Sequence, residues 1–395
     1  MKILHFVSHF SLLSETFIYD EIQALEKTSL HDNSVLTFER HLEQDRPFSR
    51  VQVLSKTPSR AQKLRRQYLK HFKGIKVPRE DLSLYSYWAQ NFDSFDIIQV
   101  HFGWNAIPLC QTLKLLGLEK KKPIIVRCQG SDINSAPLLD EGYRRRFLEL
   151  AQYPNVVLTA NSEFMHQKML KLGIAPAKIH RVANAFNRSF LTQRKKHFFK
   201  PGDCLKLVNT ARFIGWKGQR YLVKGFARFV REVYANASLT LIGDGETQAQ
   251  VKQLAVEEGI SEKIKFPGSI PHHQLAEALS AHDLYVHPSI IDPLTHQEEG
   301  LPISVLEAMA VGLPLVVTRT GGMPEIVGED NTFARIVPHQ DSDAIYQALK
   351  ELFEAGNGFQ DNSAYAEQRL AAFSTVNQLQ DLTAAYVKAL QHCQR

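Results

Sequence analysis

The sequence predicts an α/β protein made of two Rossmann-like domains, and three observations support this prediction. The chain has 395 residues, more than one ordinary hydrophobic core accommodates. Short apolar runs alternate with amphipathic segments along both halves, which is typical of parallel strands joined by helical crossovers. The alternation breaks at residues 197–203, where basic residues precede Pro201 and Gly202. We therefore expect a linker there, and two domains that face each other across a ligand-binding cleft.

The first domain is expected over residues 1–197. Buried strands are predicted where short apolar runs end in polar turns, at Lys2–Val7, Ser34–Phe38, Ile97–Val100, Ile124–Arg127, Val156–Ala160 and Ile179–Val182. Helices are predicted where apolar residues recur with helical spacing, at Glu15–Leu25, Glu141–Gln152 and Glu163–Leu172.

The second domain is expected over residues 204–374, with a strand series of its own. Its strands are predicted at Lys206–Ala211, Ser238–Ile242, Ile264–Phe266, Leu284–His287 and Leu315–Thr318. Its helices are predicted at Gly218–Tyr234, Gln248–Glu258, His272–Ala281 and Ile303–Val311. A last helix, Gln378–His392 within residues 375–395, ends the chain.

The composition is that of a globular protein without a membrane-spanning segment. Hydrophobic residues make up 44% of the chain and charged residues 22%. No apolar stretch approaches the roughly 18 to 20 residues that a membrane helix needs, and Met1–Val7 is interpreted as a buried strand rather than a signal sequence. The four cysteines are scattered and the histidines lack a metal-binding spacing. We expect a cytoplasmic location and no bound metal.

Basic residues are concentrated in one segment, Lys56–Arg79, of a chain whose net charge is +6. Leu64, Tyr68, Leu69 and Phe72 interleave with the charges, as in a basic amphipathic helix. Two interpretations stay open: a solvated helix face, or a site for anionic lipid headgroups at the inner membrane or for a phosphorylated acceptor. Nucleic acid fits less well because no recognised binding motif accompanies the charge. The cations are Lys56, Arg60, Lys63, Arg65, Arg66, Lys70, Lys73, Lys76 and Arg79.

The most informative segment is EGLPISVLEAMAVG, which begins at Glu299. Gly300 allows close approach of the backbone, and Pro302 suits the first position of a helix. The free amides of the first helical turn, near Ile303, favour an anion. Glu299 lies outside the helix and Glu307 inside it, where a carboxylate can accept hydrogen bonds from a vicinal diol such as that of a ribose. The small apolar residues after Glu307 favour a buried rather than an exposed helix face.

Two further segments follow predicted strands of the second domain. TARFIGWKG carries Arg212 and Lys217, which can hold phosphate oxygens through a guanidinium fork and a point charge. A loop Arg and Lys are more often plain surface charges, but their place at the end of a strand favours a site. LIGDGE contains Gly243 and Gly245 and is interpreted as a strand-to-helix turn near a nucleotide, because it lacks a full dinucleotide fingerprint. The loops Phe266–Ile270 and His287–Asp292 also end strands and are candidates to line the base pocket.

Together these segments resemble the retaining family 4 glycosyltransferases of the GT-B fold. The matching pieces also include HPS at His287–Ser289 and GGMPEIV at Gly321–Val327, and they cover most of Lys206–Val337. In the first domain, LLSETFI and VHFGWNA are similar to members of the family that assemble bacterial exopolysaccharide, lipopolysaccharide and colanic acid.

The resemblance implies a UDP- or GDP-linked sugar as the donor substrate, a saccharide or lipid-linked acceptor bound by the first domain, and no cofactor or metal. It implies that Arg212 and Lys217 hold the diphosphate, Glu307 the ribose hydroxyls and Glu299 the donor sugar. It also implies that the last helix, within residues 375–395, crosses back onto the first domain. The catalytic residues expected are Glu299, Arg212, Lys217 and His101, although a lone His after a buried strand is more often structural. The donor-binding residues expected are Arg212, Lys217, Gly243, Gly245, Glu299, Gly300, Leu301, Pro302, Ile303 and Glu307.

Two segments depart from the family pattern. Gln129 stands where many members have a histidine, and Asn184–Asn187 replaces an Asn-Gly-x-Asp segment. Since glutamine still donates and accepts hydrogen bonds, we expect an active enzyme. The alternatives are a non-catalytic subunit of an assembly complex that binds a sugar nucleotide, and a nucleotide-sugar epimerase.

Overall fold

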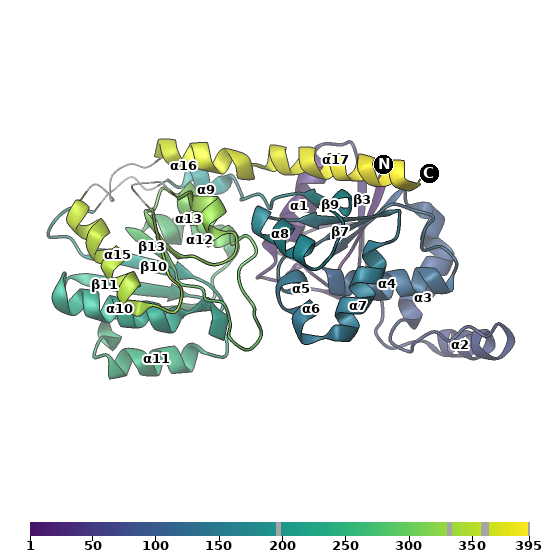
Figure 1. The fold of residues 1–395 in the computed structure, drawn as a ribbon, viewed down its shortest axis with the longest axis horizontal. Coiled ribbons are helices and arrows are strands. Elements are labelled where there is room, and N and C mark those ends of the chain that lie inside the picture. The colour runs from purple at the N-terminus through teal and green to yellow at the C-terminus, as the bar shows by residue number, and fades with distance from the viewer. Residues whose placement is uncertain (195–198, 330–333, 357–362, 394–395) are drawn as a thin grey trace. The chain divides into compact units, whose positions relative to one another are not determined.

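The structure is a computed structural model that describes residues 1–194, 199–329, 334–356 and 363–393 (Figure 1). It contains two compact units, Met1–Ala183 with Thr375–Arg395, and Asn184–Ser374. Residue 197, where the sequence predicted the end of the first domain, lies outside the described residues. So do residue 198 of the expected linker and the last two residues of the segment 375–395. The first unit ends earlier, at Ala183, and residues 375–393 return to it.

The first unit contains a seven-stranded parallel sheet in the order β5-β3-β1-β6-β7-β8-β9. A separate parallel pair joins β2 (His9–Phe10) and β4 (Glu39–Arg40). The sheet strands are β1 (Lys2–Phe6), β3 (Asp32–Thr37), β5 (Val51–Val53), β6 (Ile97–His101), β7 (Ile124–Arg127), β8 (Val156–Ala160) and β9 (Ile179–Arg181).

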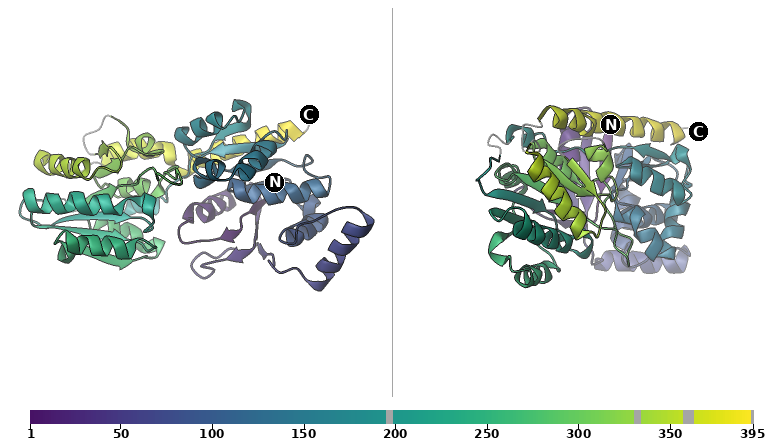
Figure 2. Two further views of the ribbon diagram at one scale, coloured as in Figure 1. Left: turned by 60° about the horizontal axis from the view of Figure 1, so that its bottom comes forward. Right: turned by 60° about the vertical axis from the view of Figure 1, so that its left-hand side comes forward.

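Helices pack on the sheet of this unit, and α2 projects away from the rest of it (Figures 1 and 2). They are α1 (Thr16–Lys27), α2 (Arg60–Phe72), α3 (Leu82–Asn91), α4 (Gly103–Leu115), α5 (Ser131–Asn134), α6 (Ala136–Leu139), α7 (Glu141–Ala151), α8 (Glu163–Lys171) and α17 (Thr375–Cys393).

Helix α17 completes the core of the first unit although it lies at the end of the chain. Leu382 and Tyr386 are fully buried among sheet residues that include Ile97 and Val157. The Tyr386 hydroxyl donates to Gln99 Oε1 at 2.5 Å.

The second unit has a six-stranded parallel sheet in the order β12-β11-β10-β13-β14-β15. Its strands are β10 (Leu205–Thr210), β11 (Ala237–Ile242), β12 (Ile264–Gly268), β13 (Leu284–His287), β14 (Leu315–Thr318) and β15 (Ala334–Val337). Its helices are α9 (Ser189–Thr192), α10 (Gln219–Glu232), α11 (Gln248–Glu257), α12 (His272–Ser280), α13 (Ile303–Ala310), α14 (Met323–Val327), α15 (Ser342–Ala355) and α16 (Ser363–Leu370).

The prediction of two Rossmann-like α/β parts is confirmed. Every strand predicted from the sequence is present, with ends displaced by at most two residues. The basic amphipathic helix is α2, and the last helix begins three residues earlier than predicted. The short edge strand β5 and the buried helices α3 and α4 were not predicted. No helix in the described part of the chain combines the length and the apolar character that crossing a bilayer requires.

Candidate functional site

The strand order of the second unit creates a switch point between β10 and β13. From β10 the chain continues to β11 on one side, and from β13 it continues to β14 on the other. Sheets of this kind bind ligands beyond the carboxyl ends of the strands at such a point. Arg212 and Lys217 follow β10, and Glu299 lies in the segment between β13 and α13. The two segments that the sequence singled out therefore meet at the switch point.

Lys217 and Glu299 form an ion pair there. The Nζ atom of Lys217 lies 2.6 Å from Oε1 of Glu299, and the two side chains are only 13% and 6% exposed. The ammonium group also lies 4.2 Å from the centre of the Trp216 ring, in a cation–π arrangement. The pair is thus held in a largely dry environment.

Gly218 explains how the two loops come so close. Its φ of 68° lies in the left-handed region, and a Cβ atom there would stand 2.0 Å from the carbonyl oxygen of Pro288. Only glycine allows the loop after β10 to rest on the backbone of the segment after β13. This contact places Lys217 next to Glu299.

The Glu299 carboxylate has three donors on a single oxygen. Oε1 accepts hydrogen bonds from Lys217, from His287 Nε2 at 2.7 Å and from Ser289 Oγ at 2.6 Å. Burial would raise the pKa of this carboxyl, but the Lys217 charge and the His287 hydrogen bond outweigh burial and hold the pKa well below its usual range. Oε2 accepts no hydrogen bond from a described residue, so it is available to a ligand.

His287 and Ser289 were expected only as part of a loop that lines the base pocket, and their contact with Glu299 was not predicted. Burial lowers the pKa of His287 despite the neighbouring Glu299, so the imidazole is neutral and Nε2 carries the proton it donates. The Tyr285 hydroxyl lies 3.2 Å from the other ring nitrogen, Nδ1. The signal was present in the sequence, because His287 is the last residue of a predicted buried strand and faces the same edge of the sheet as Lys217.

Arg212 is exposed, and its side chain makes no hydrogen bond or ion pair to a described residue. Its positive charge contributes to a lowered pKa of Lys217, whose main cause is burial, with Glu299 acting in the opposite direction. The structure therefore brings Lys217 and Glu299 into contact and leaves the Arg212 guanidinium unengaged.

Helix α13 begins with free backbone amides. Pro302 is its N-cap rather than its first helical residue, and no side chain caps the helix. Leu301 is 5% exposed, and the Gly300 carbonyl accepts from Gly322 N at 3.0 Å. The turn before Ile303 is thus fixed by backbone contacts, which leaves the first amides of the helix for an anion.

Glu307 lies within α13 and is 4% exposed, which confirms that this face of the helix is buried. His272 Nε2 lies 2.7 Å from its Oε1. The second oxygen, Oε2, has no partner among the described residues. His272, which the sequence did not mark as a site residue, therefore orients the Glu307 carboxylate.

Gly243 and Gly245 lie in the turn after β11. Their φ values are 135° and 152°, and a Cβ atom would stand 2.0 Å from the Ala211 carbonyl oxygen and 2.3 Å from that of Phe213. Both glycines therefore let this turn pack on the backbone of the loop that carries Arg212.

His101 lies in the first unit at the end of β6 and is 1% exposed. Its Nε2 is 3.4 Å from His5 Nδ1, and its Nδ1 has no partner among the described residues. Burial and the nearby charges of His5 and Arg127 lower its pKa well below the usual value, so the ring is neutral. A contact of His101 with substrate stays a prediction.

The segment that departs from the family pattern, Gln129–Asp132, follows β7. Asp132 is fully buried, and its two oxygens accept from the backbone amides of Gly130 and Gly103, each at 2.9 Å. The main-chain carbonyl of Gln129 accepts from Asn161 Nδ2 at 2.9 Å. The turn is therefore held by Asp132 and by the main-chain carbonyl of Gln129.

Within the described residues, the group that could hold a metal ion is His9, Glu39 and His41, whose ligand atoms lie within 4.8 Å of one another. Glu39 already forms an ion pair with Lys56, which offsets its charge. This group is in the first unit, and none of its members is a predicted donor-site residue.

Comparison with known proteins gives a consistent result. Residues 191–369 match the family described as Glycosyl transferases group 1. The chain is 27% identical over 261 residues to the amylovoran biosynthesis glycosyltransferase AmsK of Erwinia amylovora, covering 65% of this chain and 61% of AmsK. It is 25% identical over 378 residues to the putative colanic acid biosynthesis glycosyltransferase WcaL of Escherichia coli, covering 88% of this chain and 90% of WcaL.

Solved structures share the fold of the whole chain. HepE of Anabaena, solved in complex with UDP and glucose, superposes with a TM-score of 0.75 at 18% identity and covers 98% of this chain and 99% of its own. The lipopolysaccharide outer core galactosyltransferase WaaB, in its apo form, has a TM-score of 0.70 at 14% identity and covers 98% and 99% of the two chains. The fold is therefore the GT-B fold expected from the sequence.

Proposed function

We propose, from the match of residues 191–369 to the glycosyl transferases group 1 family, that this chain is a retaining glycosyltransferase of bacterial surface polysaccharide synthesis. It would transfer a sugar from a UDP- or GDP-linked donor to a glycan or lipid-linked saccharide. The relatives named for amylovoran and colanic acid biosynthesis support this class of product. The observation that carries the proposal is the Lys217–Glu299 pair at the switch point of the second sheet.

The donor would lie across the ends of β10 and β13. The diphosphate would meet Lys217, Arg212 and the free amides of α13 near Ile303. The ribose diol would donate to Oε2 of Glu307, and a sugar hydroxyl to Oε2 of Glu299. Each carboxylate is held through its Oε1 by a neighbour, which orients the oxygen that would bind the donor.

Transfer would proceed by stabilisation of the leaving group. When the bond from the anomeric carbon to the phosphate oxygen breaks, the electron pair stays on the diphosphate, and positive charge develops on the sugar ring. Lys217, Arg212 and the α13 amides stabilise that growing negative charge in place of a metal ion. The acceptor hydroxyl attacks from the face that the diphosphate leaves, and its proton passes to the departing phosphate oxygen, which retains the anomeric configuration.

The test is a donor screen followed by analysis of the product. Thermal shift with common UDP- and GDP-sugars should identify a donor that raises Tm, because a ligand that binds only the folded state stabilises it. Incubation with that donor and membrane-extracted acceptor should give an α-linked product from an α-linked donor by NMR. A product of inverted configuration would contradict retention. Donor binding without transfer would favour the non-catalytic subunit, and conversion of the donor without acceptor would favour the epimerase.

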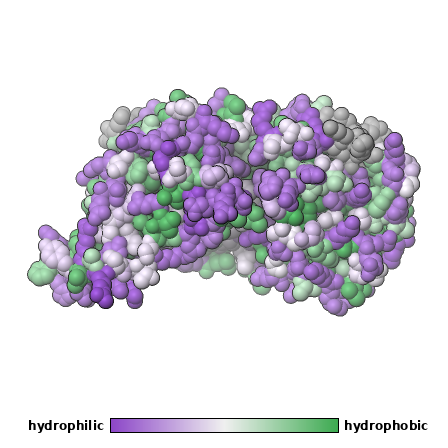
Figure 3. All heavy atoms as spheres, turned by 180° about the vertical axis from the view of Figure 1, so that it is seen from behind, coloured by the Kyte–Doolittle hydropathy of each residue, from purple (hydrophilic) through white to green (hydrophobic). Residues whose placement is uncertain are grey.

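We also propose that α2 brings the enzyme to an anionic membrane surface. Leu64, Tyr68 and Phe72 are 66%, 52% and 76% exposed and recur every four residues, so they share one face of the helix. Figure 3 shows apolar groups among hydrophilic ones on the projecting segment. Of the nine cations of Lys56–Arg79, only Lys56 has a carboxylate partner among the described residues. Exposed apolar residues beside unpaired cations suit lipid headgroups.

Sedimentation with vesicles tests this contact. Phosphatidylglycerol vesicles should carry the protein down, whereas phosphatidylcholine vesicles should not. The double change Leu64→Ser and Phe72→Ser should abolish co-sedimentation. The matched control is Val256→Ser on α11, an apolar residue of similar exposure at 59%. Equal sedimentation of both variants would exclude α2 as the contact.

A further inference from the structure

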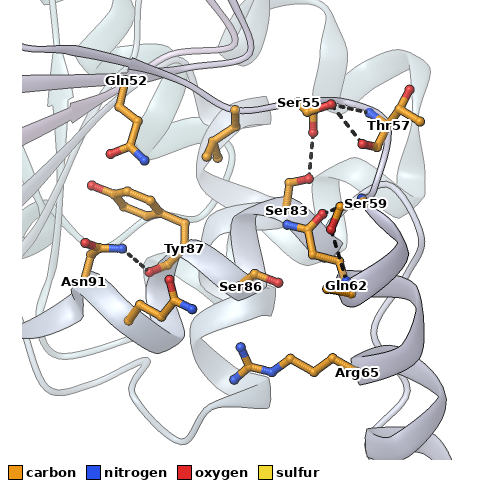
Figure 4. Close-up of a pocket in the computed structure, with 13 residues that line it drawn as sticks. Gln52, Ser55, Thr57, Ser59, Gln62, Arg65, Ser83, Ser86, Tyr87 and Asn91 are labelled. Atoms are coloured by element: carbon orange, nitrogen blue, oxygen red, sulfur yellow. Dashed lines mark hydrogen bonds between the residues drawn. The ribbon is translucent and has the colours of Figure 1, made fainter.

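An open pocket of about 520 Å³ lies in the first unit, at the free edge of the sheet. Its walls come from β5, the loop that follows it, α2 and α3 (Figure 4). The volume falls in the range of about 300–1,000 Å³ typical of small-ligand sites. None of the donor-site residues predicted above lines it.

Hydrogen bonds fix the rim of this pocket. Ser59 and Gln62 form a capping box at the start of α2, with Gln62 N donating to Ser59 Oγ at 3.2 Å and Ser59 N to Gln62 Oε1 at 2.8 Å. Ser83 Oγ on α3 donates to the Ser55 carbonyl at 2.6 Å, which ties α3 to the loop after β5. The rim is therefore organised before any ligand binds.

Polar groups inside the pocket remain without partners. Ser86 is 9% exposed, and its Oγ has no hydrogen-bond partner among the described residues. The side-chain amides of Gln52 and Gln90, which also line the pocket, make no hydrogen bond to a described residue. A buried hydroxyl without a partner is costly, so a ligand or water must satisfy Ser86.

Two side chains give the pocket its selectivity. Tyr87 forms one wall: it is 6% exposed, its ring packs in the core edge-on against Trp88, and its hydroxyl makes no hydrogen bond to a described residue. The Arg65 guanidinium stacks 5.8 Å from the Tyr85 ring and has no ion-pair partner among the described residues. None of the residues that line the pocket is an aspartate or glutamate. The site therefore favours a hydroxyl-rich ligand that carries negative charge.

We propose that this pocket binds an acidic oligosaccharide, one whose sugars carry a carboxylate, as the growing glycan of the acceptor. The proposal rests on the transferase function proposed above, because it assigns part of the acceptor to this unit. The side-chain amides and the hydroxyls of Ser86 and Tyr87 would pair with sugar hydroxyls, and Arg65 would take the carboxylate in a bidentate contact.

Helix α2 would then have two roles along its length. Ala61, Gln62 and Arg65 line the pocket near the start of the helix, whereas Leu64, Tyr68 and Phe72 form an exposed apolar row that continues to its end. A membrane-anchored glycan would enter the pocket at the start of the helix while the apolar row rests on lipid. The two roles are separable, because soluble oligosaccharides test the pocket without a membrane.

Saturation-transfer NMR with soluble tetrasaccharides tests the proposal on the full chain. The probes are the acidic tetrasaccharides of hyaluronan, heparosan and oligogalacturonate, with chitotetraose as the neutral probe and inorganic phosphate as the simple anion. At least one acidic probe should bind. The double change Gln52→Ala and Tyr87→Ala should weaken it by about tenfold or more. Arg65→Gln should remove the preference for the acidic probe over chitotetraose, and Gln67→Ala, exposed on α2 outside the pocket, should change nothing.

Three results would overturn the proposal: no acidic probe binds, the pocket variants bind as well as the wild type, or phosphate displaces the probe as an equal competitor. Circular dichroism of each variant separates lost binding from lost folding, and Arg65→Gln, a partly exposed position, keeps the test available if the double variant unfolds. Donor binding in the second unit is measured in parallel. If the protein transfers sugar but does not bind the probes, only the proposal for the pocket is contradicted. If it binds the probes but does not transfer sugar, only the proposed transferase function is contradicted.

Discussion

At the scale of single residues, the candidate site depends on a carboxylate kept charged while nearly buried. Glu299 is 5% exposed and keeps its charge because Lys217, His287 and Ser289 all donate to one oxygen. The second oxygen, Oε2, remains free to accept a hydrogen bond, as a ligand hydroxyl would donate. Glu307 repeats the arrangement with a single donor, His272.

Glu299→Gln should destabilise the second unit in a pH-dependent way. It leaves the Lys217 ammonium, 13% exposed, without its counter-charge, which we expect to cost about 3 kcal/mol in the free energy of unfolding at pH 7. Because the folded-state pKa of Glu299 lies below the unfolded value of about 4.3, its stabilising contribution is complete above that pH and fades as the pH falls further. Urea unfolding at pH 7, 5 and 3.5 measures the difference between wild type and variant. A difference that grows in acid would contradict this account of the charge.

Glu307→Gln should weaken donor binding. A charged acceptor for two ribose hydroxyls is worth about 1.5–3 kcal/mol, so the Kd for the nucleoside diphosphate should rise by about ten- to hundredfold. The control is Glu277→Gln on α12, which is exposed and should leave the Kd unchanged. Isothermal titration measures both, and equal Kd values would remove Glu307 from the site.

At the scale of elements, the site is assembled by loops that follow neighbouring strands. The sequence predicted the strands because each is a short apolar run. It predicted Lys217 from the loop that follows one of these runs, and Glu299 from its place just before the start of a helix. It did not predict that Ser289 and His287 support Glu299, since that contact depends on β10 lying beside β13, a pairing between strands far apart in the chain. The edge strand β5 escaped prediction because two of its three residues are exposed and it has no buried run.

Gly218→Ala should damage the element that positions Lys217. Any non-glycine residue at a φ of 68° costs about 1–2 kcal/mol, and the added Cβ would also collide with the Pro288 carbonyl oxygen. The matched control is Gly259→Ala, at a φ of 67° with nothing within 4 Å of the new Cβ. Both variants should lose stability, but only Gly218→Ala should lose more than about 2 kcal/mol and weaken donor binding. Identical losses in unfolding and binding would show that the loop contact is unimportant.

At the scale of the whole molecule, the chain builds each unit around its own parallel sheet, and the end of the chain serves the first unit. The sequence predicted a final helix and two domains, and the family resemblance suggested a return of that helix. Composition could not locate the change of unit at Ala183, because residues 184–194 contain no linker signal and Phe190 is buried in the second unit. The domain boundary was instead predicted near residue 200, because the basic residues there precede Pro201 and Gly202.

Leu382→Ala should destabilise the first unit alone. Leu382 of α17 is fully buried against the sheet of that unit, and such a truncation costs about 2–5 kcal/mol. The control is Val387→Ala, which is 47% exposed on the same helix and should cost under about 1 kcal/mol. Hydrogen exchange should report faster opening of β1, β6 and β7 in Leu382→Ala, while β10 and β13 keep wild-type protection. Equal acceleration in both sheets would contradict the assignment of α17 to the first unit.

The proposed transfer depends on stabilisation of the negative charge that develops on the departing diphosphate. Substitution of Lys217 tests this stabilisation most directly. Steady-state transfer from the identified donor should be compared for the wild type, Lys217→Ala and Lys224→Ala, the last being an exposed lysine on α10 of the same unit. The account predicts that Lys217→Ala lowers kcat by about a hundredfold or more, with Lys224→Ala unchanged. Turnover near the wild-type level in Lys217→Ala would contradict it.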